Sequence, residues 1–184
     1  MLRILGVGLS RTGTTSLTTA LSRLGYRAEH YCWHTFRKII FDGHRDFRLF
    51  DSIEALTDIP GAYYYQQIAK AYPALKYIQT IRDVDSWWHS MCAHCDRLEE
   101  ERDKNAEHWR FVRALHGQVY GSPTPHEGLY KRRYLEFNQQ LRETIPADQL
   151  LIMDITAADG WGVLCPFVGK PVPPSPFPHE NKRL

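Results

Sequence analysis

Small and hydroxyl-bearing residues cluster near the start of the chain, in the segment Gly8-Leu-Ser-Arg-Thr-Gly13-Thr14-Thr15. The segment follows an apolar run at residues 2–7 and precedes a stretch with helical periodicity that starts at Thr14. A loop between a strand and a helix turns its backbone N–H groups, and the positive end of the helix dipole, toward an anion. The pattern therefore predicts an anion-binding loop in which threonine hydroxyls add further donors. The alternative is a glycine turn followed by a threonine N-cap.

Two common nucleotide-binding motifs do not match this loop. In a Walker A loop a lysine follows the second glycine and reaches the β- and γ-phosphates, whereas Thr14 occupies that position here. A dinucleotide-binding loop needs a third glycine, and Arg11 stands in its place. A small kinase or nucleotide hydrolase stays open as an alternative, because the run that ends in Asp154 is similar to a strand with a magnesium-binding aspartate.

A second motif with basic and hydroxyl groups lies in the middle of the chain. Arg82 follows a predicted strand at residues 75–81, and Ser90 lies two turns into the helix that begins near Val84. A guanidinium offers fork-shaped donors to a phosphate, and a serine hydroxyl adds one more. The motif is consistent with a phosphate site. The alternative is a salt bridge of Arg82 with a neighbouring aspartate, with Ser90 an ordinary helix residue.

Apolar runs alternate with helical patterns along the chain, which is typical of a parallel sheet covered by helices. Strands are predicted at residues 2–7, 26–31, 75–81 and 149–153, and residues 55–57 are ambiguous between strand and turn. Helices are predicted from Thr14, over 33–40, from Pro60, from Val84, over 130–145 and over 161–168. The stretch from Val84 is long, and its charged part at 96–108 is expected to be solvated and flap-like. These elements predict an α/β fold with a three-layer, doubly wound parallel sheet. We expect one domain over residues 1–184, with a proline-rich tail at 171–184.

The overall charge argues against several classes of partner. The 184 residues include 23 Lys and Arg against 21 Asp and Glu, so the formal charge is only +2. This balance predicts no attraction to nucleic acid or to an anionic membrane. No apolar run is long enough to span a bilayer or to act as a secretory signal, so a cytoplasmic location is expected. Cys92 and Cys95 form a lone C-x-x-C pair within a predicted helix, so no metal site is expected.

Three regions together resemble the sulfotransferase family, specifically its short branch within the P-loop superfamily. Residues 11–15 resemble the 5′-phosphosulfate loop of that family, and Arg82 with Ser90 resembles its 3′-phosphate motif. The third region comprises Trp161-Gly-Val-Leu-Cys-Pro-Phe-Val-Gly-Lys-Pro171 and Pro176-Phe-Pro-His-Glu-Asn181. The resemblance implies a sulfotransferase topology and 3′-phosphoadenosine 5′-phosphosulfate (PAPS) as the donor, with adenosine 3′,5′-bisphosphate as the product. The residues implied to bind the donor are Ser10, Arg11, Thr12, Gly13, Thr14, Thr15, Ser16, Arg82 and Ser90.

The resemblance also implies in-line transfer of the sulfuryl group to a hydroxyl or amine of a small-molecule or glycan acceptor. Arg11 and the hydroxyls of Thr14 and Thr15 are the candidates for stabilising the leaving oxygen. Asp58 is the candidate general base by its position after a strand-like segment; its alternative role is a helix cap, and His30 and Glu54 are weaker candidates. The aromatic residues proposed for an acceptor pocket, or else for the core, are Trp33, Tyr63, Tyr64, Tyr65, Trp87 and Trp88. His179 and Asn181 are candidates to close over the donor, and a non-catalytic nucleotide-binding protein is the second alternative function.

Overall fold

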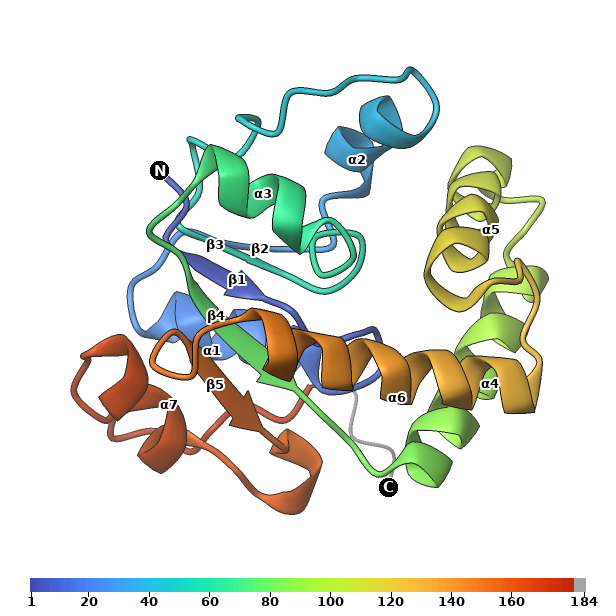
Figure 1. The fold of residues 1–184 in the computed structure, drawn as a ribbon. Coiled ribbons are helices and arrows are strands. Elements are labelled where there is room, and N and C mark those ends of the chain that lie inside the picture. Colours follow the sequence, from blue (N-terminus) through green and yellow to red (C-terminus); the bar gives the residue numbers. More distant parts are fainter. Residues whose placement is uncertain (181–184) are drawn as a thin grey trace.

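The computed structural model describes residues 1–180 and contains a five-stranded parallel sheet. Its strands are β1 (Ile4–Gly6), β2 (Ala28–His30), β3 (Ala55–Thr57), β4 (Lys76–Thr80) and β5 (Leu150–Met153), in the spatial order β2-β3-β1-β4-β5. The helices are α1 (Thr14–Arg23), α2 (Trp33–Ile40), α3 (Tyr65–Ala71), α4 (Val84–Glu100), α5 (Ala106–Tyr120), α6 (Glu127–Thr144), the 3₁₀ helix η1 (Ile155–Ala157) and α7 (Trp161–Val168) (Figure 1). Because β3 and β4 lie on opposite sides of β1, the loop after β1 lies where the strand order reverses. Ligands of open α/β sheets bind at such a point.

Helices cover both faces of the sheet and make three layers, as the sequence predicted. Successive residues of β1 point to opposite faces, so that Leu5 packs in one apolar cluster and Ile4 in the other. The cluster of Ile4 includes Leu17 of α1 and Leu164 of α7, whereas the cluster of Leu5 includes Ile68 of α3 and Leu141 of α6. Near-continuous apolar strands buried on both faces are typical of parallel sheets. The predicted fold class is confirmed.

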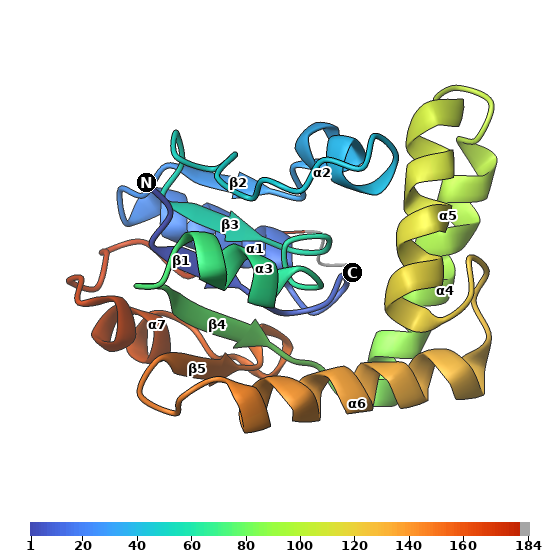
Figure 2. The same ribbon diagram turned by 45° about the horizontal axis from the view of Figure 1, so that its top comes forward.

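The helices α4 and α5 form a hairpin beyond the carboxyl ends of the strands (Figure 2). The hairpin includes the charged stretch 96–108, which was expected to be a solvated part of a long helical segment. The segment is divided into two helices, because α4 ends at Glu100 and α5 begins at Ala106, and most of the charged stretch is helical. Its charged side chains are largely exposed, and its apolar side packs against α2 and α6. Within residues 1–180, no helix combines the length and the apolar character needed to cross a membrane.

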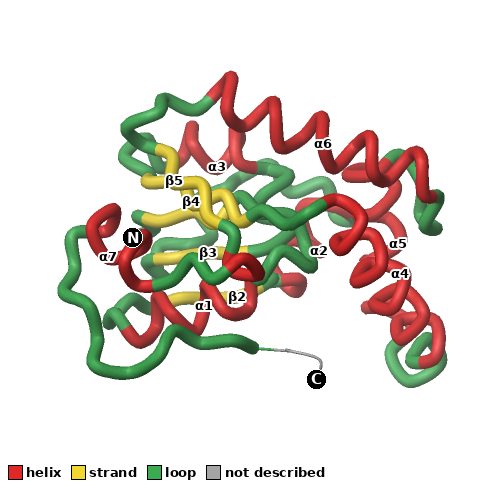
Figure 3. The backbone as a smooth tube through the Cα atoms, turned by 90° about the horizontal axis from the view of Figure 1, so that it is seen from below, coloured by secondary structure: helices red, strands yellow, loops and turns green. Residues whose placement is uncertain are grey.

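Most predicted elements are present, with one clear error. The predicted helices at 33–40 and 161–168 have the bounds of α2 and α7, and the ambiguous segment 55–57 is strand β3. The helix predicted from Pro60 is wrong in its start, because α3 begins only at Tyr65. Asp58 has a positive φ of 75°, and hydrogen bonds from Ala62 N to Asp58 O and from Tyr64 N to Pro60 O form turns before the helix. Residues 171–180 of the proline-rich tail form a loop that runs past α1 (Figure 3).

Gly8 allows the loop after β1 to lie directly against β4. A Cβ at this position would lie 1.9 Å from Thr80 Oγ1 and 2.8 Å from the Thr80 carbonyl oxygen. We expect Gly8→Ala to lower the free energy of unfolding by about 1–3 kcal/mol, because the loop must move away from Thr80 to make room for the methyl group. Gly162→Ala in α7 is the control: nothing lies within 4 Å of its Cβ, and loss of a helical glycine is expected to stabilise by about 0.5–1 kcal/mol. Chemical denaturation measures both, and a Gly8→Ala protein as stable as the parent would contradict the tight packing.

Candidate functional site

The loop between β1 and α1 has the backbone conformation of an anion-binding site. Arg11 and Gly13 both have a positive φ, of 74° and 96°, so the chain turns sharply before α1. No side chain of the described residues caps the N-terminus of α1. The first N–H groups of a helix have no partner within the helix, and they carry the positive end of its dipole. This end of α1 is therefore suited to bind an anion.

Buried hydrogen bonds fix the conformation of the loop. The Thr12 hydroxyl donates to the Leu9 carbonyl oxygen at 2.7 Å and lies 2.6 Å from the Thr80 hydroxyl. Trp87 Nε1 on α4 donates to the Ser10 carbonyl oxygen at 2.9 Å. The expectation that the Thr12 hydroxyl would bind a ligand oxygen is wrong, because this side chain is fully buried and bonded within the protein. Thr12 fixes the shape of the loop instead.

The second basic motif meets the loop. Arg82 donates through Nε to the Ser86 hydroxyl at 2.8 Å and through Nη1 to the Arg11 carbonyl oxygen at 3.5 Å. Arg11 in turn donates through Nε to the Ser90 hydroxyl at 3.1 Å. Two guanidinium groups and two hydroxyls thus lie together, although Arg11 and Arg82 are 71 residues apart in sequence.

The alternative interpretation required a salt bridge between Arg82 and a neighbouring aspartate. Asp83 and Asp85 bind other groups instead. Asp83 is the N-cap of α4 and accepts from Ser86 N at 2.9 Å. Asp85 accepts from Lys131 at 2.7 Å. The Arg82 guanidinium therefore remains directed at the loop.

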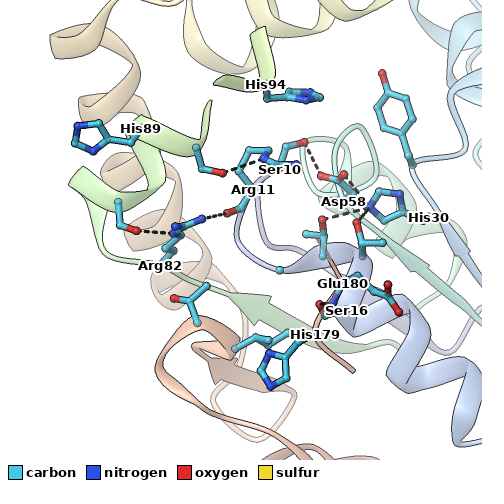
Figure 4. A pocket seen from close by; sticks show the side chains of 18 of the residues that line it. Ser10, Arg11, Ser16, His30, Asp58, Arg82, His89, His94, His179 and Glu180 are labelled. Carbon is cyan, nitrogen blue, oxygen red and sulfur yellow. Dashed lines mark hydrogen bonds and ion pairs between the residues drawn. The ribbon is translucent and has the colours of Figure 1, made fainter. Parts of the chain in front are cut away.

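His30 and Asp58 form an ion pair beside the start of α1 (Figure 4). His30 Nε2 lies 3.0 Å from Asp58 Oδ2, and it also lies 3.3 Å from the hydroxyls of Thr14 and Thr15. The other carboxylate oxygen of Asp58 accepts from the Ser10 hydroxyl at 2.6 Å and from Ile59 N at 2.8 Å. Parallel pairing explains the contact, because His30 is in register with Thr57, the residue before Asp58. His30 is the last residue of β2, and Asp58 directly follows β3, so both lie at the carboxyl ends of adjacent strands.

The pair shifts the pKa of both partners toward the charged forms. Burial alone would raise the pKa of Asp58, but the hydrogen bond and the attraction of His30, with the bonds from Ser10 and Ile59, lower it. Burial alone would lower the pKa of His30, but the hydrogen bond and the negative charge of Asp58 raise it. The resting site therefore holds a carboxylate beside an imidazole that binds its proton more tightly than usual.

This ion pair predicts a stability contribution with a defined pH range. Because the pKa of Asp58 is lowered from 3.8, its contribution is present above that pH and is lost as the pH falls through the folded-state pKa. Because the pKa of His30 is raised from 6.5, its contribution is complete below that pH and is lost as the pH rises through the folded-state pKa. We expect His30→Gln to lose most stability between pH 3.8 and 6.5. With the His30 side chain 32% exposed, the loss should be at most about 3 kcal/mol.

Denaturant titrations of both proteins at a series of pH values measure this loss. The difference between parent and variant should shrink on the alkaline side. A difference that is equally large in mildly acidic and mildly alkaline buffer would contradict the ion pair.

One cavity of about 980 Å³ joins these groups. Of the residues proposed from sequence, it is lined by Ser10, Arg11, Gly13, Thr14, Thr15, Ser16, Asp58, Arg82 and Ser90. Of the weaker base candidates, His30 lines the cavity, whereas Glu54 directly precedes β3 and pairs with Arg3 and Arg27. The aromatic residues proposed for an acceptor pocket do not line it, and Trp87 in particular is buried in the core. The sequence thus identified basic and hydroxyl residues that line the cavity, but the aromatic residues it suggested for an acceptor pocket lie elsewhere.

The tail reaches the same cavity from the other side of the sheet. Glu180 N donates to the Ser16 hydroxyl at 2.9 Å, and His179 and Glu180 both line the cavity. The tail is fixed by Trp161 Nε1, which donates to the Ser175 carbonyl oxygen at 2.7 Å. His179 is therefore near the site as expected, and Asn181 lies outside the described residues.

Sequence reasoning missed Ser86, His94 and His108, which also line the cavity. The spacing of Ser86 and Ser90 by four residues places both on one face of a helix, and this signal was present in the sequence. Asp154, the candidate magnesium ligand, accepts from Thr156 N and Ala157 N as the N-cap of η1. The Asp154 carboxylate thus caps the N-terminus of η1.

Comparisons with known proteins agree with the fold and with the family that the sequence resembles. A family model described as "Sulfotransferase domain" matches residues 3–184. The "Ava biosynthesis cluster protein M" of Aspergillus versicolor is 27% identical over 210 residues, which cover 97% of this chain and 80% of that protein. The crystal structure of a sulfotransferase from Alicyclobacillus acidocaldarius is similar in fold, with a TM-score of 0.60 and 18% identity, over 100% of this chain and 86% of that one. Because the family model spans nearly the whole sequence, this chain belongs to the sulfotransferase family.

Proposed function

We propose that this chain is an enzyme that transfers the sulfuryl group of PAPS to a hydroxyl or amine of a small-molecule or glycan acceptor. One observation carries the proposal: Arg11, Arg82 and Ser90 come together with the N-terminus of α1 in one cavity. These groups belong to two separate sequence motifs. Their convergence supports a ligand that both motifs bind at once.

The groups present fit a donor with two anionic ends. One basic centre consists of Arg11 and the N-terminus of α1, and a second consists of Arg82 with the hydroxyls of Ser86 and Ser90. PAPS carries a phosphosulfate at its 5′ position and a phosphate at its 3′ position, so each centre has an anion to bind. The cavity volume of about 980 Å³ lies within the range of ordinary small-molecule sites. By contrast, Thr14 in the lysine position and Asp154 as a helix cap do not favour magnesium-dependent ATP chemistry.

The bound donor supplies a sulfuryl group on a phosphate leaving group. Arg11, the hydroxyls of Thr14 and Thr15, and the first N–H groups of α1 bind and orient that end of the ligand and stabilise the negative charge that grows on the leaving oxygen. Arg82 and Ser90 hold the far end, which fixes the direction of approach for the acceptor. The Thr12 and Trp87 contacts keep the loop in place during these steps.

We assign the general base to His30, and Asp58 becomes its positioning residue. The Asp58 carboxylate contacts groups that it orients or stabilises, namely the Ser10 hydroxyl, Ile59 N and His30 Nε2. Neutral His30 keeps its Nε2 proton in the bond to Asp58 Oδ2 and accepts the acceptor proton at Nδ1, and Asp58 stabilises the imidazolium that results. This order reverses the sequence-based ranking of Asp58 above His30.

Incubation of the purified protein with PAPS and a mixed panel of hydroxyl and amine acceptors tests the proposal. We expect acceptor-dependent release of adenosine 3′,5′-bisphosphate, quantified by chromatography, and none when ATP with magnesium replaces the donor. Magnesium-dependent ADP formation without that product would favour a kinase or nucleotide hydrolase instead.

A further inference from the structure

A tyrosine of α6 bonds to both backbone groups of Arg82. The hydroxyl of Tyr134 accepts from Arg82 N at 2.9 Å and donates to the Arg82 carbonyl oxygen at 2.8 Å. Arg82 lies between the end of β4 and the start of α4, outside both elements. A single buried hydroxyl thus fixes the two peptide groups on either side of the arginine, and with them the direction in which its side chain leaves the backbone.

The ring of Tyr134 also connects Arg82 with the loop after β1. It stacks on the ring of Trp87, with 4.3 Å between the ring centroids and an interplanar angle of 20°. Trp87 is fully buried, and its Nε1 donates to the Ser10 carbonyl oxygen at 2.9 Å. The two stacked rings therefore join the backbone of one basic centre to the backbone of the other.

Buried polar contacts fix α6 at the height that this arrangement needs. Gln79 on β4 donates through Nε2 to the carbonyl oxygen of Asn138 at 3.1 Å and to its Oδ1 at 3.0 Å. Asn138 lies one turn after Tyr134 on the same face of α6, and Gln79 lies three residues before Arg82. The helix also packs against α4, which begins just after Arg82 (Figure 1). The position of the Tyr134 hydroxyl is therefore set by the core.

Packing alone does not account for a tyrosine at this position. Phenylalanine would fill nearly the same volume and could stack on Trp87 in the same way. A buried hydroxyl is costly unless it is hydrogen-bonded, and this one bonds to the backbone on both sides of Arg82. Groups that bind a ligand must be held within about 0.5 Å of their productive geometry by the residues around them. The hydroxyl meets that requirement for Arg82.

We propose that Tyr134 is a positioning residue of the nucleotide site, which sets the spacing between the two basic centres through the Arg82 backbone and the stack on Trp87. The inference rests on the proposed function, in which these centres bind the two anionic ends of one nucleotide. Tyr134 acts through Arg82, since it is buried and does not line the cavity that joins the centres. A ligand with both anions depends on the spacing, whereas a ligand with a 5′ anion alone does not.

Two nucleotides that differ only in the 3′-phosphate test the role: adenosine 3′,5′-bisphosphate and adenosine 5′-monophosphate. Tyr134→Phe removes the hydroxyl and keeps the ring on Trp87. We expect the Kd of the bisphosphate to rise by about tenfold, because Arg82 loses two bonds that orient it. The Kd of the monophosphate should change by less than about twofold, since Thr12 and Trp87 still hold the loop. Calorimetry, with competitive titration for the weaker ligand, measures both constants, and equal changes in the two, or none, would overturn the inference.

Tyr130→Phe is the matched control on the same helix. Tyr130 lies one turn before Tyr134, is fully buried, and donates to the Ser122 carbonyl oxygen at 2.8 Å. Its ring also stacks, on Tyr120 with 4.5 Å between the centroids, but it does not line the cavity. Chemical denaturation verifies that both variants are folded. The ratio of the two dissociation constants should stay at its parental value in Tyr130→Phe, and a comparable shift there would show that loss of any buried hydroxyl has this effect.

A double substitution tests whether Tyr134 acts through Arg82. In an Arg82→Ala background there is no guanidinium left to orient, so adding Tyr134→Phe should change the Kd of the bisphosphate by less than about twofold. The full tenfold effect in that background would refute the positioning role.

The parent protein separates failure of this inference from failure of the proposed function. A parent that binds the bisphosphate, with an unaltered ratio of constants in Tyr134→Phe, refutes only the positioning role. A parent that does not bind the bisphosphate refutes the proposed function and this inference with it.

Discussion

Replacing His30 by glutamine is expected to lower kcat by about 10²- to 10⁴-fold, the usual contribution of a general base. Glutamine retains a polar side chain near Asp58 but cannot accept a proton at neutral pH. Affinity for adenosine 3′,5′-bisphosphate should remain close to that of the parent, because the two basic centres come from other residues. The measurement is steady-state kinetics with PAPS and an acceptor, together with calorimetry. His34→Gln on α2 is the matched control, since that histidine is exposed and does not line the cavity.

The pH dependence distinguishes a base from a structural residue. A base acts only when it is deprotonated, and Asp58 raises the pKa of His30 above 6.5. We therefore expect kcat/KM of the parent to increase as the pH rises through that pKa. Asp58→Asn should move this rise to lower pH, since the charge that raises the pKa of His30 is gone, whereas His30→Gln should abolish it. A full rate in His30→Gln, with the same pH profile, would contradict the assignment.

Arg82→Ala is expected to weaken the binding of adenosine 3′,5′-bisphosphate by about 10- to 150-fold. A hydrogen bond to a charged group contributes roughly 1.5–3 kcal/mol, which corresponds to that range of affinity. The variant also removes contacts to Ser86 and to the Arg11 carbonyl oxygen, so both basic centres are affected. Arg82→Lys should be intermediate, because an ammonium group keeps the charge but loses the fork of donors.

A control substitution of an arginine outside the cavity distinguishes the loss of the Arg82 contacts from the loss of one positive charge. Arg132 on α6 has a 64% exposed side chain and pairs with Glu136. Arg132→Ala should bind the nucleotide as the parent does, and the affinity of the Arg82 variant should depend less on salt. Identical dissociation constants for the Arg82 and Arg132 variants would remove Arg82 from the site.

Local patterns were sufficient to predict the strands other than β3, the loop and most helices. The apolar run before Gly8 and the periodicity after Thr14 indicate a strand, a turn and a helix, and these are present as β1, the loop and α1. The start of α3 was not predictable in this way, because the turns after Asp58 depend on its positive φ and not on the proline that follows.

Contacts between distant segments were harder to predict than elements. Asp58 and His30 were ranked separately, because the spacing of residues along the chain does not tell which strands are neighbours. Only the register of β2 against β3 shows that the two side chains meet. The sequence also did not show that His94 and His108 line the cavity. The two histidines belong to α4 and α5, and the spacing of residues does not tell which side of this helix pair lies against the loop after β1.

Calorimetric titration of the protein with adenosine 3′,5′-bisphosphate, without metal, tests most directly whether the two basic centres bind one nucleotide. The same titration with ATP, with and without magnesium, provides the comparison. The convergence of Arg11, Arg82 and Ser90 predicts one tight, metal-independent site for the bisphosphate and weak binding of ATP in both buffers. Tighter binding of ATP that requires magnesium, or no binding of the bisphosphate, would contradict it.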